Sequence, residues 1–178
     1  MSPDEIFRGQ SHVYVVAYGS LMFADGINGR GMRHVYRDDE LTLVRIRNYS
    51  RGMTCRWGKT HYYGIRPVEG GDLVAVVFKV HNAKDLRMLN LSEGCDSDGN
   101  SRHEDGGYMC TTVNPSDISV QLDAPAYVYQ LNQYPQHGKS TANPRYTDYV
   151  DKGISELWGP IVLDDFHSNL EATSAPIS

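Results

Sequence analysis

The run at residues 73–80, with the sequence L-V-A-V-V-F-K-V, is the feature that most constrains the fold of this chain. Nearly all of its residues are apolar, and most are β-branched or aromatic. A strand with one face in water would have a polar residue at every second position. Near-continuous apolarity is instead typical of a strand that other elements cover on both faces. The run therefore predicts a buried strand with packing partners above and below it.

Shorter runs of the same kind predict further strands. They lie at residues 12–17, 41–49, 61–66, 108–113, 118–122 and 126–131. Between two of them, the sequence Glu69-Gly70-Gly71-Asp72 is typical of a tight turn, so we expect residues 61–66 and 73–80 to form a hairpin.

Two segments have helix signals. Residues 82–91 begin with Asn82, a good N-cap, and Asp85 follows three positions later. Residues 145–158 follow Asn143-Pro144, a cap and then a proline at the first turn. Together these patterns predict an α+β fold: a mixed, curled β-sheet or barrel of about six or seven strands with two main flanking helices.

Length and composition narrow the class of protein. The chain has 178 residues, which suits a single domain. We expect its core at about residues 11–163 and a loosely ordered tail at 164–178. The formal net charge of −5 argues against nucleic acid as a partner, since nucleic-acid binders usually carry a basic face. The composition leaves the oligomeric state open.

The cysteines and the first residues indicate the compartment. Three cysteines with no CxxC pair argue against a disulfide framework and favour a reducing interior. The first ten residues are polar and acidic, and the apolar run after them is too short for a signal or membrane segment. We therefore expect a cytoplasmic protein with no membrane partner.

The sequence Tyr18-Gly19-Ser20-Leu21 follows the first predicted strand. It has two interpretations. Glycine and serine are common where a strand simply ends. A glycine after a buried strand also lets backbone N–H groups point into a cleft, where they can bind an anion or a developing negative charge.

The sequence Leu89-Asn90-Leu91-Ser92-Glu93-Gly94 indicates a helix that stops at Gly94. Glu93 then lies at the negative end of the helix dipole, where Lys or Arg would be more stable by about 0.3–1 kcal/mol. Because this cost in stability is small, a glutamate can occur at this position without any function. The same dipole would raise the pKa of the carboxyl group, which suits a group that carries protons.

These two stretches and a third, Asn143-Pro144-Arg145-Tyr146, occur in the order found in a known family. The chain resembles the γ-glutamylcyclotransferase-like superfamily, whose members have a Y-G-S/T-L loop after the first strand, an L-N-x-x-E segment near mid-chain and a late P-x-x-Y helix. Gly106-Gly107-Tyr108 also matches the G-x-Y of the strand that follows the glutamate. The resemblance covers about residues 13–160, and the tyrosines on the last helix could equally be core residues.

The chain departs from the family in two places. Asn90 stands where many members have aspartate. The segment between Glu93 and Tyr108 is longer than in many members; it is polar and glycine-rich. We expect this 94–107 segment to be an exposed loop near the cleft, serving as a lid, as a partner-binding loop or as tolerated extra length.

The resemblance implies a mechanism. Such enzymes release 5-oxoproline and a free amine from γ-glutamyl amides, and the substrate's own α-amine attacks its γ-carbonyl. No cofactor, metal, catalytic serine or catalytic cysteine is needed, and one carboxylate, Glu93, would act as general acid and base. The residues implied to bind the substrate are Tyr18, Gly19, Ser20, Leu21, Tyr108 and Tyr146. Arg47 and Arg51 are further candidates as carboxylate clamps, on charge alone.

Other functions have weaker support. The seven histidines are scattered, and Asp96-Ser97-Asp98-Gly99-Asn100 only begins like a calcium loop, so no metal site is predicted. Cys55 precedes Arg56, but no histidine is placed to activate it. The main alternative is a non-catalytic module that binds a ligand or partner on the same fold. The leaving group stays open between glutathione, a γ-glutamyl amino acid, a γ-glutamyl-lysine isopeptide and a γ-glutamyl polyamine.

Overall fold

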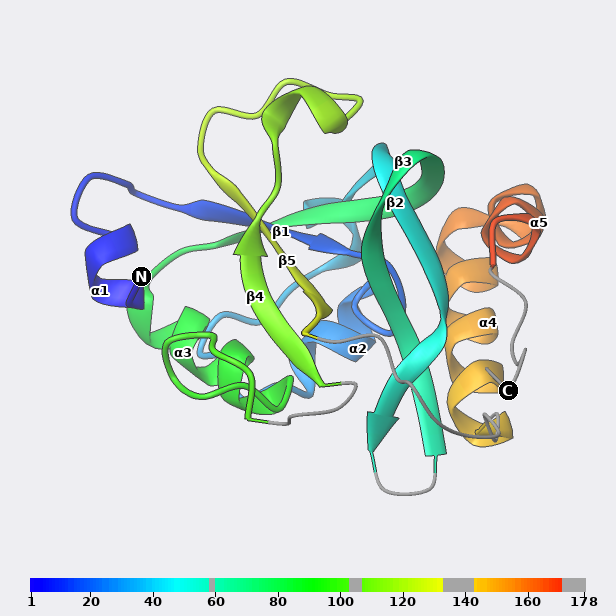
Figure 1. The fold of residues 1–178 in the computed structure, drawn as a ribbon, viewed down its shortest axis with the longest axis horizontal. Helices are drawn as coiled ribbons and strands as arrows, with labels where there is room; N and C mark the ends of the chain where they lie inside the picture. The colour runs from blue at the N-terminus through cyan, green and yellow to red at the C-terminus, as the bar shows by residue number, and fades with distance from the viewer. Residues whose placement is uncertain (58–59, 103–106, 133–142, 171–178) are drawn as a thin grey trace.

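The computed structural model describes residues 1–57, 60–102, 107–132 and 143–170. In chain order its elements are α1 (Pro3–Ile6), β1 (Val13–Ala17), α2 (Ala24–Asn28), the 3₁₀ turn η1 (Asp38–Glu40), β2 (Thr42–Trp57), β3 (Thr60–Val80), α3 (Ala83–Ser92), β4 (Tyr108–Thr112), the 3₁₀ turn η2 (Pro115–Asp117), β5 (Ala126–Leu131), α4 (Pro144–Trp158) and α5 (Pro160–Ser168) (Figure 1). The predicted α+β class is confirmed.

The strands form one mixed sheet of five strands in the order β2-β3-β1-β5-β4. β1 pairs antiparallel with β3 and parallel with β5, and β4 pairs antiparallel with β5. The prediction of six or seven strands in a barrel is wrong, because among the described residues the sheet is open, with β2 and β4 at its edges. Two predicted strands merge into one, and a third is not formed.

The merged strand is β3, which runs through the predicted turn and pairs with β2 along its length. Gly70 adopts a φ of 80° and Asn48, opposite it on β2, a φ of 65°. A β-carbon on Gly71 would lie 2.2 Å from the carbonyl oxygen of Tyr49. The two glycines therefore serve a bulge that bends the long hairpin, and the prediction of a tight turn at residues 69–72 is wrong.

The predicted strand at 118–122 is reduced to one bridge, between Ile118 and Ile46 of β2. In this antiparallel bridge, residues 119–122 would continue toward Thr42 of β2. The N–H of Arg45 instead donates to the hydroxyl of Ser119 at 2.9 Å, so it is not available to a backbone carbonyl of the run. The apolar run thus covers the edge of β2 without extending the sheet.

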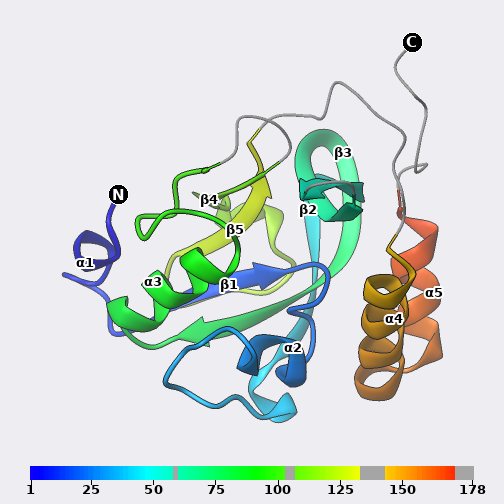
Figure 2. The same cartoon turned by 90° about the horizontal axis from the view of Figure 1, so that it is seen from below.

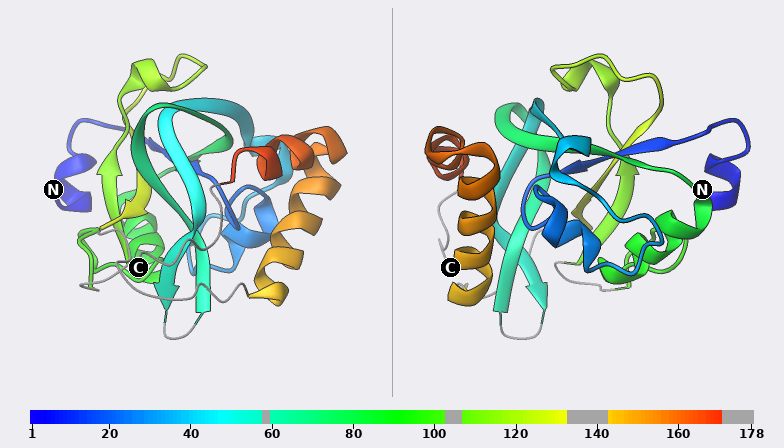
Figure 3. Two further views of the ribbon diagram at one scale, coloured as in Figure 1. Left: turned by 45° about the vertical axis from the view of Figure 1, so that its right-hand side comes forward. Right: turned by 180° about the vertical axis from the view of Figure 1, so that it is seen from behind.

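The buried strand at 73–80 is confirmed. Within it Lys79 alone is exposed, and every other residue is at most 3% exposed. Seen from below, α2 and α3 lie in front of β1 and cover that side of the sheet (Figure 2). α4 and α5 pack together beside the β2–β3 hairpin, at the opposite end of the molecule from α1 (Figure 3).

Both predicted helices are present. Asn82 caps α3 by accepting from the N–H of Asp85 at 2.8 Å. Asn143 caps α4 in the same way, and Pro144 is its first residue. In the middle of α4, a β-carbon on Gly153 would lie 2.4 Å from the Phe23 ring, so this glycine admits the ring at some cost in helix propensity.

The helix α5 is missing from the sequence prediction. Its Phe166 is fully buried, so the prediction of a loosely ordered tail from residue 164 is wrong as far as residue 168. Residues 171–178 lie outside the described part of the chain. Among the described residues, no helix is both long and apolar enough to cross a bilayer.

Candidate functional site

A pocket lies at the end of the sheet where β1 finishes. β1 and β5 are parallel, so their C-terminal ends meet there, and β4 runs antiparallel to β5, so its first residue lies beside them. The lining residues are Val16, Ala17, Tyr18, Gly19, Ser20, Leu21, Tyr63, Glu93, Tyr108, Tyr129 and Tyr146. Glu93 and the six residues that the resemblance implies as substrate-binding therefore border one cavity.

The loop after β1 forms one wall. Its chain turns where the N–H of Met22 donates to the carbonyl of Gly19 at 3.0 Å. A β-carbon on Gly19 would lie 3.1 Å from the Tyr146 hydroxyl, and one on Gly26 of α2 would lie 1.6 Å from the carbonyl oxygen of Ser20. These glycines let α4 and α2 pack closely around the loop. Among the described residues, no acceptor bonds the N–H groups of residues 19–21, which leaves them available to a ligand oxygen.

Glu93 ends α3. Gly94 has a φ of 77°, and the N–H groups of Gly94 and Cys95 donate back to the carbonyls of Leu91 and Asn90 at 3.1 and 3.0 Å. This Schellman motif is the helix stop that the sequence predicts. It aims the Glu93 carboxyl group away from α3 and into the pocket.

Glu93 is 7% exposed, and burial raises the pKa of its carboxyl group, while the positive charge of Arg30 lowers it in part. Nη1 of Arg30 lies 3.0 Å from Oε1 of Glu93, but not in a direction that makes a hydrogen bond, so Oε1 has no hydrogen-bond partner among the described residues. A buried carboxylate with so few donors holds a proton more readily than one in water. This is the protonation behaviour that a general acid and base requires.

Arg30 is the site residue that the sequence interpretation misses. It follows α2 and contacts two residues that line the pocket, Ser20 and Glu93. Its Nε donates to the carbonyl of Gly26 at 3.1 Å and its Nη2 to Oγ of Ser20 at 2.9 Å. It therefore joins the loop after β1 to Glu93. In the sequence, its charge is the only signal, and its partner lies sixty-three residues away by the numbering.

The two arginines that the sequence nominates as clamps lie elsewhere. Nη2 of Arg47 donates to the carbonyl of Ser116 at 2.8 Å, at an exposed position. Arg51 is fully buried and donates to the carbonyls of Tyr18 and Phe166 at 3.2 and 3.0 Å. Neither lines the pocket, so both nominations are corrected by the structure.

The tyrosines build the remaining walls. The hydroxyl of Tyr18 donates to the carbonyl of Tyr129, and that of Tyr108 to the carbonyl of Tyr63. The Tyr146 ring packs against the Tyr63 ring, with 5.5 Å between their centroids. Burial and then the charge of Glu93 raise the pKa of Tyr146, so its hydroxyl stays protonated and able to donate.

Asn90, the departure from the family pattern, has a structural role. It accepts a hydrogen bond from the Tyr129 hydroxyl at 2.6 Å and donates one to the carbonyl of Ser97 at 2.9 Å. An ionised aspartate has no donor for that second bond. The asparagine therefore suits the longer segment that follows, because it ties Ser97 of that segment to the sheet.

The longer segment folds beside β4. The backbone of Cys95 pairs with that of Ser101 in an isolated antiparallel β-bridge, and the N–H of Cys110 donates to the carbonyl of Gly99 at 2.8 Å. None of residues 94–102 lines the pocket. Residues 103–106 of the expected loop, which include Gly106 of the family pattern, lie outside the described residues.

Burial of the two described thiols makes them poor nucleophiles, since it raises the pKa of Cys95 and of Cys110 to about 12. Both are free of disulfides. The side chain of Cys55 lies outside the described part of the structure.

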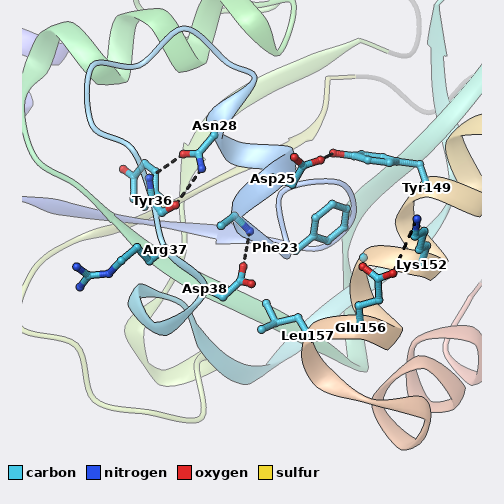
Figure 4. Close-up of a pocket in the computed structure, with 12 residues that line it drawn as sticks. Phe23, Asp25, Asn28, Tyr36, Arg37, Asp38, Tyr149, Lys152, Glu156 and Leu157 are labelled. Atoms are coloured by element: carbon cyan, nitrogen blue, oxygen red, sulfur yellow. Dashed lines mark hydrogen bonds and ion pairs between the residues drawn. The ribbon is translucent and has the colours of Figure 1, made fainter.

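The pocket at Glu93 is small. Its volume is about 30 Å³, close to the space of one water molecule. A larger cavity of about 570 Å³ lies beyond the loop, between α2, η1 and α4 (Figure 4). Its walls carry mixed charge, with the Tyr149 hydroxyl donating to Asp25 at 2.5 Å and Lys152 3.9 Å from Glu156. It contains none of the nominated residues.

Comparison with solved structures identifies the fold. An uncharacterised human protein, loc79017, superposes with a TM-score of 0.62 and 17% identity, over 95% of each chain. A γ-glutamyl cyclotransferase superposes with a TM-score of 0.61 and 15% identity, over 94% of each chain. YkqA from Bacillus subtilis gives a TM-score of 0.66 and 15% identity, over 93% of this chain and 56% of that one.

No protein-family model and no curated protein matches the chain by sequence. The chain therefore has the γ-glutamylcyclotransferase-like fold, as the sequence resemblance implies. At these identities the likeness extends to the fold alone, and the activity must be argued from the pocket.

Proposed function

We propose that the protein is a γ-glutamyl cyclotransferase that releases 5-oxoproline and a free amine from a γ-glutamyl amide. The observation that carries the proposal is the pocket itself. A buried carboxyl group with a raised pKa, Glu93, shares it with the N–H groups of residues 19–21, which have no acceptor in the described part of the chain. One group moves protons and the other binds oxygen, which are the two tasks of this reaction.

In the proposed mechanism, Glu93 takes a proton from the α-ammonium group of the substrate. The freed amine attacks the γ-carbonyl carbon, so a new C–N bond closes the five-membered ring and the carbonyl oxygen becomes an oxyanion. When the oxyanion collapses, the bond to the leaving nitrogen breaks, and Glu93 returns its proton to that nitrogen. The regenerated carboxylate then takes the extra proton of the ring nitrogen, which leaves the lactam N–H, and passes it to the released amine, which departs as an ammonium ion. No covalent enzyme intermediate forms, and holding the two ends of the substrate together supplies much of the rate.

The N–H groups of residues 19–21 would bind the glutamyl group or its oxyanion. Tyr146, whose hydroxyl stays protonated beside Glu93, is the further donor. The charge of Arg30 favours the ionised form of Glu93, since it opposes the effect of burial on the pKa of that carboxyl group. A cavity of about 30 Å³ does not hold a glutamyl group, so the pocket must widen when substrate binds, and the partly exposed Tyr146 is the lining side chain best placed to move.

The direct test is product formation. The protein is incubated with glutathione, a γ-glutamyl amino acid, γ-glutamyl-lysine and a γ-glutamyl polyamine, and 5-oxoproline is measured. We expect one of these classes to be turned over. The matched control is the same substrate with an acetylated α-amine, which cannot attack and must give no product. Absence of 5-oxoproline from all four classes would reject the proposal.

A non-catalytic binding module is the second candidate. Two observations favour a binding module. Arg30 forms an ion pair with Glu93, the proposed general base, and the pocket has a small volume. If the protein only binds its ligand, a γ-glutamyl compound should raise the melting temperature of the protein without being consumed. The proposed enzyme predicts stabilisation only with the acetylated control or with an inactive variant, because true substrate is converted.

A further inference from the structure

Two histidines and a glutamate that are distant in the sequence meet outside the pocket. His34 lies between α2 and η1, Glu40 is the last residue of η1, and His81 links β3 to α3. One ligand atom of each lies within 4.8 Å of the other two, and this is the one such group of three found among the described residues. The sequence prediction of scattered histidines is therefore corrected for these two.

The three ligand atoms lie close enough to share one ion after small side-chain movements, since all are within 4.8 Å of one another. Nε2 of His34 lies 2.8 Å from Oε1 of Glu40, and the rings of His34 and His81 are 4.6 Å apart between centroids. Two ligands of a tetrahedral zinc ion are separated by roughly 3.3 Å, given bonds of about 2.0–2.1 Å. An ion would enter after the His34–Glu40 contact opens by a few tenths of an ångström and loses its shared proton.

The backbone around these ligands is held in place. The buried Asp85 accepts from the N–H groups of Arg33 and His34 at 2.7 and 3.2 Å. The second oxygen of Glu40 accepts from the N–H of Arg37 at 2.6 Å, which turns Oε1 toward His34. Ligands fixed by such outer contacts lose little freedom when a metal binds.

The neighbourhood is also aromatic and partly open. The Tyr36 ring lies 4.5 Å from that of His34 between centroids, and Asn28 fixes the Tyr36 backbone through two hydrogen bonds (Figure 4). His81 is exposed, and both His81 and Glu40 line a cavity of about 510 Å³. Water can therefore complete the coordination from that side.

Two other histidine–carboxylate pairs in the molecule provide a comparison. His12 lies 2.8 Å from Asp123, and His167 lies 2.8 Å from Asp151, the same separation as in the His34–Glu40 pair. Neither belongs to a group of three ligands among the residues that the structure describes. A short histidine–carboxylate contact is thus common in this protein, and the third ligand is what distinguishes His34 and Glu40.

We propose that His34, Glu40 and His81 form a binding site for a divalent transition-metal ion of the zinc type. Two imidazoles and one carboxylate suit zinc and its neighbours, whereas magnesium and calcium prefer oxygen ligands alone. The ion would join the segment after α2 to the boundary of β3 and α3. That segment begins beside Arg30, so bound metal would steady the residue that pairs with Glu93.

The test is calorimetric titration of Zn²⁺ into the full chain after removal of metal with a chelator. We expect one ion per chain, no binding of Mg²⁺ under the same conditions, and a Co²⁺ complex with the strong visible absorption of four-coordinate cobalt. His81→Ala should weaken Zn²⁺ binding at least about tenfold, since even the loss of an outer contact costs about 10–100-fold. His81 is exposed, so this variant should fold.

The matched controls are His12→Ala and His167→Ala, which remove histidines at the same distance from a carboxylate. They should leave Zn²⁺ affinity unchanged, and circular dichroism should show the same fold in all variants. His34→Gln should repeat the loss seen for His81→Ala. The proposal is overturned if the wild-type chain binds no zinc, or if the control substitutions weaken binding as much as His81→Ala. None of these readouts depends on release of 5-oxoproline.

Discussion

Two buried charges of opposite sign contribute to the loop after β1 in different ways. Arg51 donates to the carbonyls of Tyr18, Val74 and Phe166 at 3.2, 3.0 and 3.0 Å and lies 3.6 Å above the Phe166 ring. Glu93, which shares the pocket with that loop, has one ion pair, and its Oε1 has no hydrogen-bond donor among the described residues. Nε of Arg51 also has no partner among the described residues, but the other two guanidinium nitrogens donate three bonds, whereas Glu93 relies on a single ion pair.

The difference separates a structural charge from a chemical one. Burial lowers the pKa of Arg51 to about 9, so the group is still protonated at neutral pH and its bonds to three segments persist. Burial raises the pKa of Glu93, which brings its two protonation states closer in free energy. A group that moves protons needs two protonation states of similar free energy. A group that joins segments must instead stay in one protonation state.

The largest expected effect is on catalysis. Glu93→Gln should reduce release of 5-oxoproline by about 10²–10⁴-fold, because the amide cannot carry a proton between the two nitrogens. Unlike removal of Arg51, it should not lower the melting temperature at pH 7. The folded state holds the Glu93 proton more tightly than the unfolded chain, so the ionised carboxylate costs stability above its raised pKa.

A pH series of melting temperatures checks this sign. As the pH falls through the raised pKa, wild type should gain stability relative to Glu93→Gln. Retained turnover in the variant would remove Glu93 from the mechanism and with it the contrast between the two charges.

The second effect is on stability. Arg51→Met should lower the free energy of unfolding by about 3 kcal/mol or more, because three buried carbonyls lose a charged donor. Denaturant unfolding measures the change. The control is Arg47→Met, which removes an exposed side chain that donates to the carbonyl of Ser116, and should cost less than about 1 kcal/mol. Equal losses in both variants would show that burial of Arg51 contributes nothing special.

The third effect tests how closely the loop is held between the two charges. Gly26→Ala places a β-carbon 1.6 Å from the carbonyl oxygen of Ser20, so α2 or the loop must move. We expect a loss of about 1–3 kcal/mol in stability and a decrease in kcat/KM of up to about 10². Gly29→Ala, next to the end of the same helix, meets open space and should change neither. Normal kinetics in Gly26→Ala would mean that the loop position is not critical.

The smallest effect is a shift in pH dependence. Arg30→Met removes the charge that lowers the pKa of Glu93, so that pKa should increase. Because Glu93 must be ionised to accept the first proton, the acidic limb of the kcat/KM profile should move to higher pH. Arg33→Met, an exposed arginine of the same segment, should leave the limb in place. A shift to lower pH would contradict the assigned role of Arg30.

Much of the fold can be predicted from the sequence because its signals are local. The caps at Asn82 and Asn143 and the stop at Gly94 act within four residues, and all three are confirmed. The errors arise where one local signal has two structural uses. Gly70-Gly71 fits a turn or a bulge equally well, and only the pairing of β3 with β2 decides for the bulge.

The candidate site divides in the same way. The sequence nominates Glu93 and the loop after β1, since each lies at the end of a recognisable element. It does not reveal Arg30, whose role depends on where α2 packs, nor the His34–Glu40–His81 group, which three separate segments assemble.

By itself, the order of apolar runs, caps and glycines determined the α+β class, the buried strand at 73–80, the starts of α3 and α4, and where Glu93 ends its helix. Only the tertiary structure decided which charges meet. The free energy of a charge depends on the donors, acceptors and water within a few ångströms of it, and residues far apart in the chain supply those neighbours.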